Sequence, residues 1–168
     1  EHLIVLVGDT RGAGGVCSEK RTGKVEWKSQ DEQAANAAPI VAHFAGRKPG
    51  QIVAFMADSL LGLDLATGER LWRVPMTTTY GRHVMTPVVV DDLVLVSSKE
   101  NPLMGIAPGP GPEPGAWTAP VRWQAKNVLV NFSSPVAVGG HVYGLGPEKN
   151  LFCVDARSGA LKWSQAGF

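Results

Sequence analysis

The feature that most constrains the fold is an internal repeat. Three segments align without a gap and share an acidic residue, a Thr-Gly or Ser-Gly pair and a Trp four positions after the Gly; they are residues 17–27, 62–72 and 153–163. A fourth copy, residues 103–123, keeps the Trp but has a Pro- and Gly-rich insertion, residues 107–115, in place of the acid and the turn. Because a repeat unit of this size cannot bury its apolar residues alone, the chain is predicted to fold as a row of stacked, similar units.

Each unit has the sequence signature of short strands joined by turns. A small residue, a Pro and an apolar run precede three of the four copies, beginning at Ala38, Thr86 and Ser134. Asp91-Asp92 and Gly139-Gly140 lie between apolar runs and are predicted two-residue hairpin turns. The four repeated Trp residues are 40 to 51 residues apart, which is typical of a propeller blade. The sequence therefore predicts an all-β fold of four-stranded antiparallel sheets, about four β-propeller blades, at roughly residues 1–33, 34–84, 85–132 and 133–168.

The repeated residues are predicted to have structural roles. An acid before the turn can accept hydrogen bonds from the turn backbone, and Gly adopts the positive φ that the turn requires. The Trp is expected to lie across the contact between blades, so that replacing Trp72 or Trp163 by Ala would cost about 3–5 kcal/mol. The residues assigned to these roles are Gly23, Trp27, Asp64, Gly68, Trp72, Trp123, Asp155, Gly159 and Trp163.

These motifs resemble the pyrroloquinoline-quinone (PQQ) repeat, the blade unit of quinoprotein dehydrogenases and of the outer-membrane-assembly propeller lipoproteins. The resemblance covers nearly the whole chain and is clearest at residues 64–72 and 155–163. It implies a propeller that usually has seven or eight blades, more than this sequence holds. It also implies a periplasmic or other extracytoplasmic location, although the chain opens without the pattern of a signal peptide.

The first unit is incomplete, since it lacks the small-Pro-apolar strand that the other three units have. Three arrangements fit this pattern: a fragment of a larger propeller, a half-propeller that closes by self-association, and a four-bladed monomer. A half-ring exposes apolar blade faces at both ends, and such patches drive association. Because a two-fold operation on two copies gives a closed eight-bladed ring, we favour a homodimer.

No catalytic residue and no metal ligand is predicted. The resemblance implies, for a dehydrogenase, PQQ beside a Ca²⁺ held by carboxylate and amide ligands, an Asp base and often a vicinal Cys pair. This chain has only Cys17 and Cys153, which align at the same blade position and are predicted to be small buried strand residues. The four His residues do not have zinc-ligand spacing, and the Gly-rich residues 11–15 precede a predicted strand, unlike a phosphate-binding loop.

Polar connections ahead of the innermost strands form the predicted ligand or partner face. In a propeller these connections gather on one side, and loops on a rigid scaffold often carry function. Beside Arg82, the pKa of His83 is expected to be lowered. The residues assigned to this face are Asn36, Tyr80, Arg82, His83, Asn131 and Ser133.

Composition excludes several classes of function. Sixteen Lys and Arg against fifteen Asp and Glu give a net charge of +1, which is not typical of proteins that bind nucleic acid or membrane surfaces. The longest apolar runs are far shorter than the roughly 20 residues of a membrane span. We therefore predict a non-catalytic scaffold that self-associates and binds other proteins without a cofactor. The alternatives are a fragment of a PQQ- and Ca²⁺-dependent dehydrogenase and a propeller that binds a small ligand.

Overall fold

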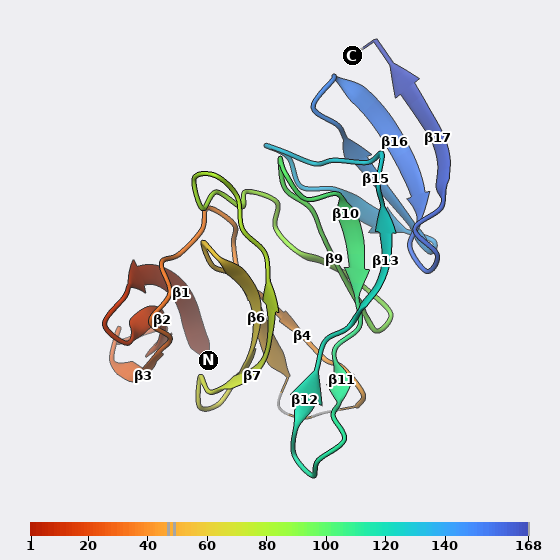
Figure 1. The fold of residues 1–168 in the computed structure, drawn as a ribbon. Helices are drawn as coiled ribbons and strands as arrows, with labels where there is room; N and C mark the ends of the chain where they lie inside the picture. The colour runs from red at the N-terminus through yellow and green to blue at the C-terminus, as the bar shows by residue number, and fades with distance from the viewer. Residues whose placement is uncertain (47, 49, 168) are drawn as a thin grey trace.

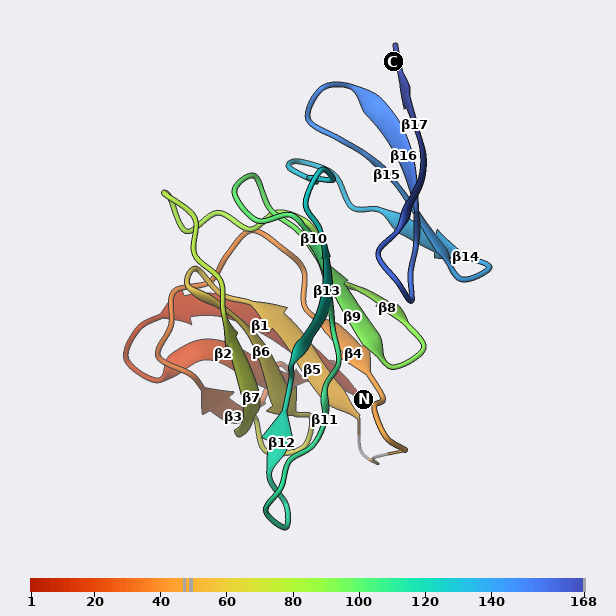
Figure 2. The same ribbon diagram turned by 45° about the vertical axis from the view of Figure 1, so that its right-hand side comes forward.

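The computed structural model describes residues 1–46, 48 and 50–167, and its regular elements are β-strands. Four large antiparallel sheets follow one another along the chain, and we call them blades 1 to 4. Figures 1 and 2 show them arranged in an open arc, with blade 1 (red) at one end and blade 4 (blue) at the other. This arrangement confirms the predicted all-β propeller fold. No helix that could cross a membrane occurs in the part of the chain that the structure describes.

Each blade is built from one stretch of the chain, with the strands β11 (Gly109–Pro110) and β12 (Trp117–Thr118) inserted between the last two strands of blade 3. Blade 1 contains β1 (His2–Asp9), β2 (Ala13–Glu19) and β3 (Val25–Ser29). Blade 2 contains β4 (Ile40–Ala42), β5 (Gln51–Phe55), β6 (Ser59–Asp64) and β7 (Arg70–Pro75). Blade 3 contains β8 (Val88–Val90), β9 (Leu93–Val96), β10 (Leu103–Ile106) and β13 (Val121–Ala125). Blade 4 contains β14 (Val136–Val138), β15 (His141–Leu145), β16 (Asn150–Asp155) and β17 (Leu161–Ala166).

The predicted hairpin turns join the first two strands of blades 3 and 4. Val90 pairs with Leu93, and Val138 pairs with His141, so each turn has two residues. Asp91 has a φ of 52°, and Gly139 and Gly140 have φ values of 57° and 76°. Positive φ at these positions is what a tight hairpin needs to match the twist of its strands.

Blade 1 has three strands, as the incomplete first repeat predicts. Its strand order is β1-β2-β3, and these correspond to the second, third and fourth strands of the other blades. Within the described residues, no strand of blade 1 takes the place that β4, β8 and β14 have in blades 2, 3 and 4. Among the residues that the structure describes, the edge of β1 opposite β2 therefore has no partner strand.

The core lies between consecutive blades. Between blades 1 and 2, Ile4, Leu6 and Trp27 pack against a buried cluster that includes Ile52 and Leu61. Because blade 2 has a neighbour on both faces, β5 and β6 are buried at every residue. This explains why these strands read as continuous apolar runs rather than as alternating ones.

The same bulge occurs at the outer edge of every blade. In blade 2, Gly62 pairs with Trp72 but the next residue, Leu63, pairs with Arg70, so Leu71 is an extra residue. The other blades shift register at the equivalent place, which makes Glu26, Arg122 and Lys162 the extra residues. A bulge of this kind re-aims the side chain of the extra residue and bends the strand.

The insertion in the third repeat forms a small hairpin of its own. It consists of β11 (Gly109–Pro110) and β12 (Trp117–Thr118), and β12 contacts β7 of blade 2. Trp117 packs against the buried cluster that contains Trp72. The hairpin thus lies at the junction between blades 2 and 3. At the other two junctions this place is taken by a Thr-Gly or Ser-Gly turn.

Candidate functional site

The Thr-Gly turns are closed by the acid that precedes them. The Oδ1 of Asp64 accepts hydrogen bonds from the backbone N–H groups of Ala66 and Thr67, at 2.8 and 3.0 Å. In blade 1 the two carboxylate oxygens of Glu19 accept from Arg21 and Thr22, at 3.0 and 2.7 Å. These bonds fix the turn so that its Gly faces the preceding blade.

Acid titration of Asp155 gives a first testable prediction. The hydrogen bonds that Ser158 donates to its carboxylate lower the pKa of Asp155 to about 2. Because this lies below the roughly 3.9 of an unfolded Asp, the carboxylate stabilises the fold above that value, and the contribution is lost as the pH falls through about 2. We expect Asp155→Asn to lower the melting temperature at neutral pH and the two proteins to converge near pH 2. If the melting temperature of Asp155→Asn stayed below that of the wild type by the same amount at every pH, this role of the carboxylate would be contradicted.

Blades are coupled by a Trp that packs on the Gly of the next blade's turn. Gly68 and Gly159 have φ values of 74° and 72°. A Cβ on Gly68 would lie 2.6 Å from the ring of Trp27, and a Cβ on Gly159 would lie 2.4 Å from the ring of Trp123. The Nε1 of Trp123 also donates to the carbonyl oxygen of Ala156, at 3.1 Å. Only Gly leaves room for the ring, so the Trp-Gly pair joins blade 1 to blade 2 and blade 3 to blade 4.

Two halves of this Trp-Gly pair are left without a counterpart at the ends of the arc. Trp163, on the last strand of blade 4, is 46% exposed. Gly23, in the turn of blade 1, has a φ of 72°, like its equivalents, but open space where a ring would pack. Blade 4 therefore presents a Trp without a Gly, and blade 1 a Gly without a Trp.

The two end faces are also apolar. On blade 1, Leu3 and Val5 are 53% and 43% exposed, whereas their equivalents in blade 2, Ile52 and Ala54, are fully buried against blade 1. On blade 4, the apolar residues Val136, Val138 and Trp163 are all exposed. Each end of the arc thus has the composition of a junction between blades but no neighbour within the described chain.

Three of the predicted loop residues meet at one pocket. Tyr80, Arg82 and Asn131 line a pocket of about 120 Å³ together with Phe132. The guanidinium of Arg82 lies 5.5 Å from the centre of the Tyr80 ring, within the range of a cation–π contact. Tyr80 and Phe132 are both exposed, so this pocket presents two aromatic side chains to solvent.

The other three loop residues lie elsewhere. His83 is fully buried: its ring stacks on Phe55 at 4.3 Å, and its Nε2 is 3.1 Å from the carbonyl oxygen of Met76. Burial is the main cause of the lowered pKa of His83, whereas the sequence had suggested the charge of Arg82. Asn36 lies beside it and donates its backbone N–H to the carbonyl of His83, at 3.0 Å. Ser133 Oγ donates to the carbonyl oxygen of Leu145, at 3.1 Å. His83 is thus a core residue and does not reach a partner directly.

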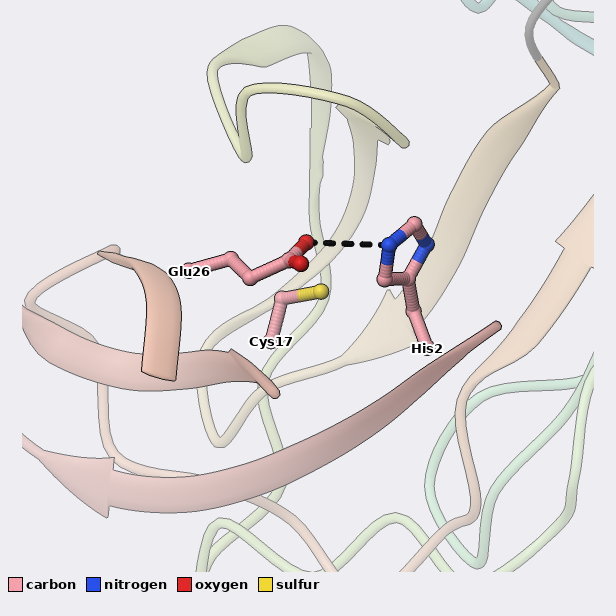
Figure 3. A group of neighbouring side chains, drawn as sticks. All are labelled: His2, Cys17 and Glu26. Carbon is pink, nitrogen blue, oxygen red and sulfur yellow. Dashed lines mark ion pairs between the residues drawn. The ribbon is translucent and has the colours of Figure 1, made fainter. Parts of the chain in front are cut away.

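One group of metal-binding side chains comes together in blade 1. His2, Cys17 and Glu26 place a nitrogen, a sulfur and a carboxylate oxygen within 4.8 Å of one another (Figure 3). Sequence spacing did not reveal this group, because its members lie on three different strands and meet only through the strand register. It contains one carboxylate and one thiol, a donor set that does not fit the all-oxygen coordination of Ca²⁺. Cys17 and Cys153 lie in different blades and form no vicinal pair, so we derive no quinone chemistry from this chain.

Comparison with models of known protein families identifies the family of the chain. The profile of the PQQ_2 family, described as outer membrane protein assembly factor BamB, matches residues 2–167. The chain belongs to this family. No curated protein sequence matches this PQQ_2 chain.

Solved structures resemble this PQQ_2 chain in fold. BamB from Moraxella catarrhalis is 15% identical, with a TM-score of 0.62 over 98% of this chain and 48% of that protein. A europium-containing methanol dehydrogenase is 14% identical, with a TM-score of 0.68 over 91% of this chain and 40% of that protein. The chain therefore spans half or less of the propellers that it resembles.

Proposed function

We propose that the chain is a non-catalytic propeller scaffold without a cofactor, and that its first activity is self-association into an eight-bladed ring. Blade 4 of each copy docks on blade 1 of the other. One observation carries this proposal: Trp163 and Gly23 are the unmatched halves of the pair that joins blades 1 and 2 and blades 3 and 4. The description of the family as an outer membrane protein assembly factor supports a periplasmic location.

In a dimer with two-fold symmetry, both end faces of each copy are covered by the other copy. In such a dimer, Trp163 of one copy packs on Gly23 of the other, and symmetry repeats the junction on the opposite side of the ring. The exposed Leu3 and Val5 then gain the neighbour that Ile52 and Ala54 already have. The loss of translational and rotational freedom on association costs about 4–15 kcal/mol. This cost arises once per dimer, whereas the apolar contacts form at two junctions. The similar propellers are about twice as long as this chain, which is the length that two copies supply.

The mass of the protein in solution tests the proposal. We expect a species of twice the 17.8 kDa of one chain, by native mass spectrometry or light scattering at micromolar concentration. Trp163→Ser is expected to shift it to the monomer, because the ring that would pack on Gly23 is gone. Tyr80→Ser, which removes an exposed aromatic residue from the connection between blades 2 and 3, serves as the matched control and is expected to leave the dimer intact.

Two results would overturn this arrangement. A folded monomer at all concentrations would show that the end faces do not pair with a second copy. Linear oligomers of increasing size would show that one copy does not make up half of a ring. A head-to-tail contact that does not close into a ring gives filaments.

A second candidate function is binding of a protein or small ligand at the pocket of Tyr80, Arg82, Asn131 and Phe132. The observation that favours it is the exposure of two aromatic side chains beside an Arg. Exposed aromatic and Arg side chains are the residue types enriched at binding hot spots.

A further inference from the structure

The side chains of His2, Cys17 and Glu26 converge on one face of blade 1. His2 lies on β1, Cys17 on β2 and Glu26 on β3. The Nε2 of His2 is 3.0 Å from a carboxylate oxygen of Glu26. Figure 3 shows the sulfur of Cys17 pointing into the space between these two groups. Three different donor atoms, one from each strand of the blade, therefore surround one point.

The local backbone explains this convergence. Cys17 pairs with Ile4 on one side, and His2 lies two residues before Ile4, so its side chain points to the same face as that of Cys17. On the other side, Cys17 pairs with Trp27 and Ser18 with Val25, which leaves Glu26 as the extra residue of the bulge. The bulge turns Glu26 toward the face that already carries the His and the Cys.

From this geometry we infer that His2, Cys17 and Glu26 form a binding site for a thiophilic divalent cation of the Zn²⁺ class, which clips the three strands of blade 1 together. Zn²⁺ accepts imidazole, thiolate and carboxylate ligands at about 2.0–2.3 Å, which sets tetrahedral donors about 3.2–3.8 Å apart. The observed separations, from 3.0 Å to at most 4.8 Å, need only small side-chain movements to reach that spacing. The fourth position is open to water.

A cation can reach this site from solvent, and it must displace the proton of the thiol to bind. Cys17 is buried at its base, while the side chains of His2 and Glu26 are 48% and 39% exposed, so a cation has a path from solvent. Burial, with the nearby charge of Glu26, raises the pKa of the Cys17 thiol. Without metal the thiol therefore keeps its proton at neutral pH, and binding of the cation releases it.

Blade 4 supplies an internal comparison. His141 and Cys153 occupy the positions of His2 and Cys17, because His141 pairs with Asp155 and Tyr143 with Cys153 in the same register. The extra residue of its bulge, however, is Lys162, whose Nζ lies 3.5 Å from a carboxylate oxygen of Asp155. A cation in place of the third donor disfavours a metal ion, so the site is expected in blade 1 and not in blade 4.

Cobalt titration of the full chain tests the site. Co²⁺ reports thiolate coordination through a sulfur-to-metal charge-transfer band and tetrahedral geometry through intense visible bands, and Zn²⁺ displaces it. We expect one Co²⁺ per chain with the charge-transfer band in the wild type and in Cys153→Ser. The band is expected to vanish in Cys17→Ser. Glu26→Lys, which copies blade 4, should weaken binding by at least about ten-fold.

Folding of the variants is checked separately. Each variant is compared with the wild type by circular dichroism, and Zn²⁺ should raise the melting temperature of the wild type and of Cys153→Ser but not that of Cys17→Ser. No charge-transfer band in the wild type at millimolar Co²⁺ would overturn the proposal. Persistence of the band in Cys17→Ser, or its loss in Cys153→Ser, would overturn it as well.

Discussion

Replacing Trp72 by Ala is expected to lower the free energy of unfolding by about 3–5 kcal/mol, the usual cost of removing a large buried aromatic side chain. Trp72 is 4% exposed and packs in the cluster between blades 2 and 3. Its Nε1 donates to the buried Oε1 of Gln51 at 2.7 Å, and the Nε2 of Gln51 has no partner among the described residues. The substitution would therefore leave a buried amide unsatisfied in addition to the cavity. Urea denaturation followed by circular dichroism measures the loss.

Trp163→Ala is the matched control for Trp72→Ala. Both residues occupy the same position of the repeat, and the motif alone predicts equal effects. Because Trp163 is 46% exposed, its loss in the monomer should cost clearly less than the loss of Trp72, and its main effect should be on dimerisation. If the two substitutions cost the same stability when both proteins are measured at a concentration where the chain is monomeric, burial at the junction does not set the contribution of these residues.

The second large effect is expected at Gly159, where an Ala substitution should cost about 2–5 kcal/mol. The left-handed backbone at a φ of 72° disfavours any Cβ by about 1–2 kcal/mol. The Cβ would also lie 2.4 Å from the ring of Trp123, and forcing that ring away adds about 1–3 kcal/mol. The midpoint of urea denaturation reports the sum of these two costs.

Gly23→Ala separates these two costs. Gly23 has the same φ of 72° in the same turn, but a Cβ there meets open space in the single chain. In the monomer, Gly23→Ala should therefore lose only the stability that the left-handed backbone costs. The difference in unfolding free energy between Gly159→Ala and Gly23→Ala then measures the Trp-Gly contact. If both variants lose the same stability, the contact contributes nothing. In the dimer, Gly23→Ala should weaken association, because Trp163 of the second copy would meet the new methyl group.

Much of the fold could be predicted because its signals are local in the sequence. The blade period, the two-residue turns at Asp91-Asp92 and Gly139-Gly140, and the missing strand of the first unit all follow from turn chemistry and spacing, and the structure contains each of them. The sequence shows the insertion of the third repeat but does not predict its hairpin, whose packing near Trp72 depends on contacts between blades.

The candidate sites could be predicted only in part, because they depend on register and burial. His83 lies in a polar stretch of sequence, yet the ring of Phe55 covers it, and nothing in the residues around it signals this. The donors of blade 1 meet because a bulge turns Glu26, and the spacing of these three residues along the chain does not show that they meet. The four repeated Trp residues have the same place on the last strand of their blades but different surroundings, because the repeat does not say which blade has a neighbour.

The strand order has a consequence for how such chains change their length during evolution. Each large sheet is made from one continuous stretch of the chain, interrupted in blade 3 only by the β11–β12 hairpin, and no described strand of one blade belongs to another. Duplication or deletion of a blade-length stretch of the gene therefore adds or removes a whole sheet without breaking a hydrogen-bonded ladder. The new neighbours need only a Trp on one side and a Gly turn on the other. Blade 3 shows that even this requirement is loose, because its hairpin takes the place of the turn beside Trp72. Copying can therefore change the number of blades, because a Trp-Gly pair, or a hairpin in place of the Gly turn, is enough to join one blade to the next.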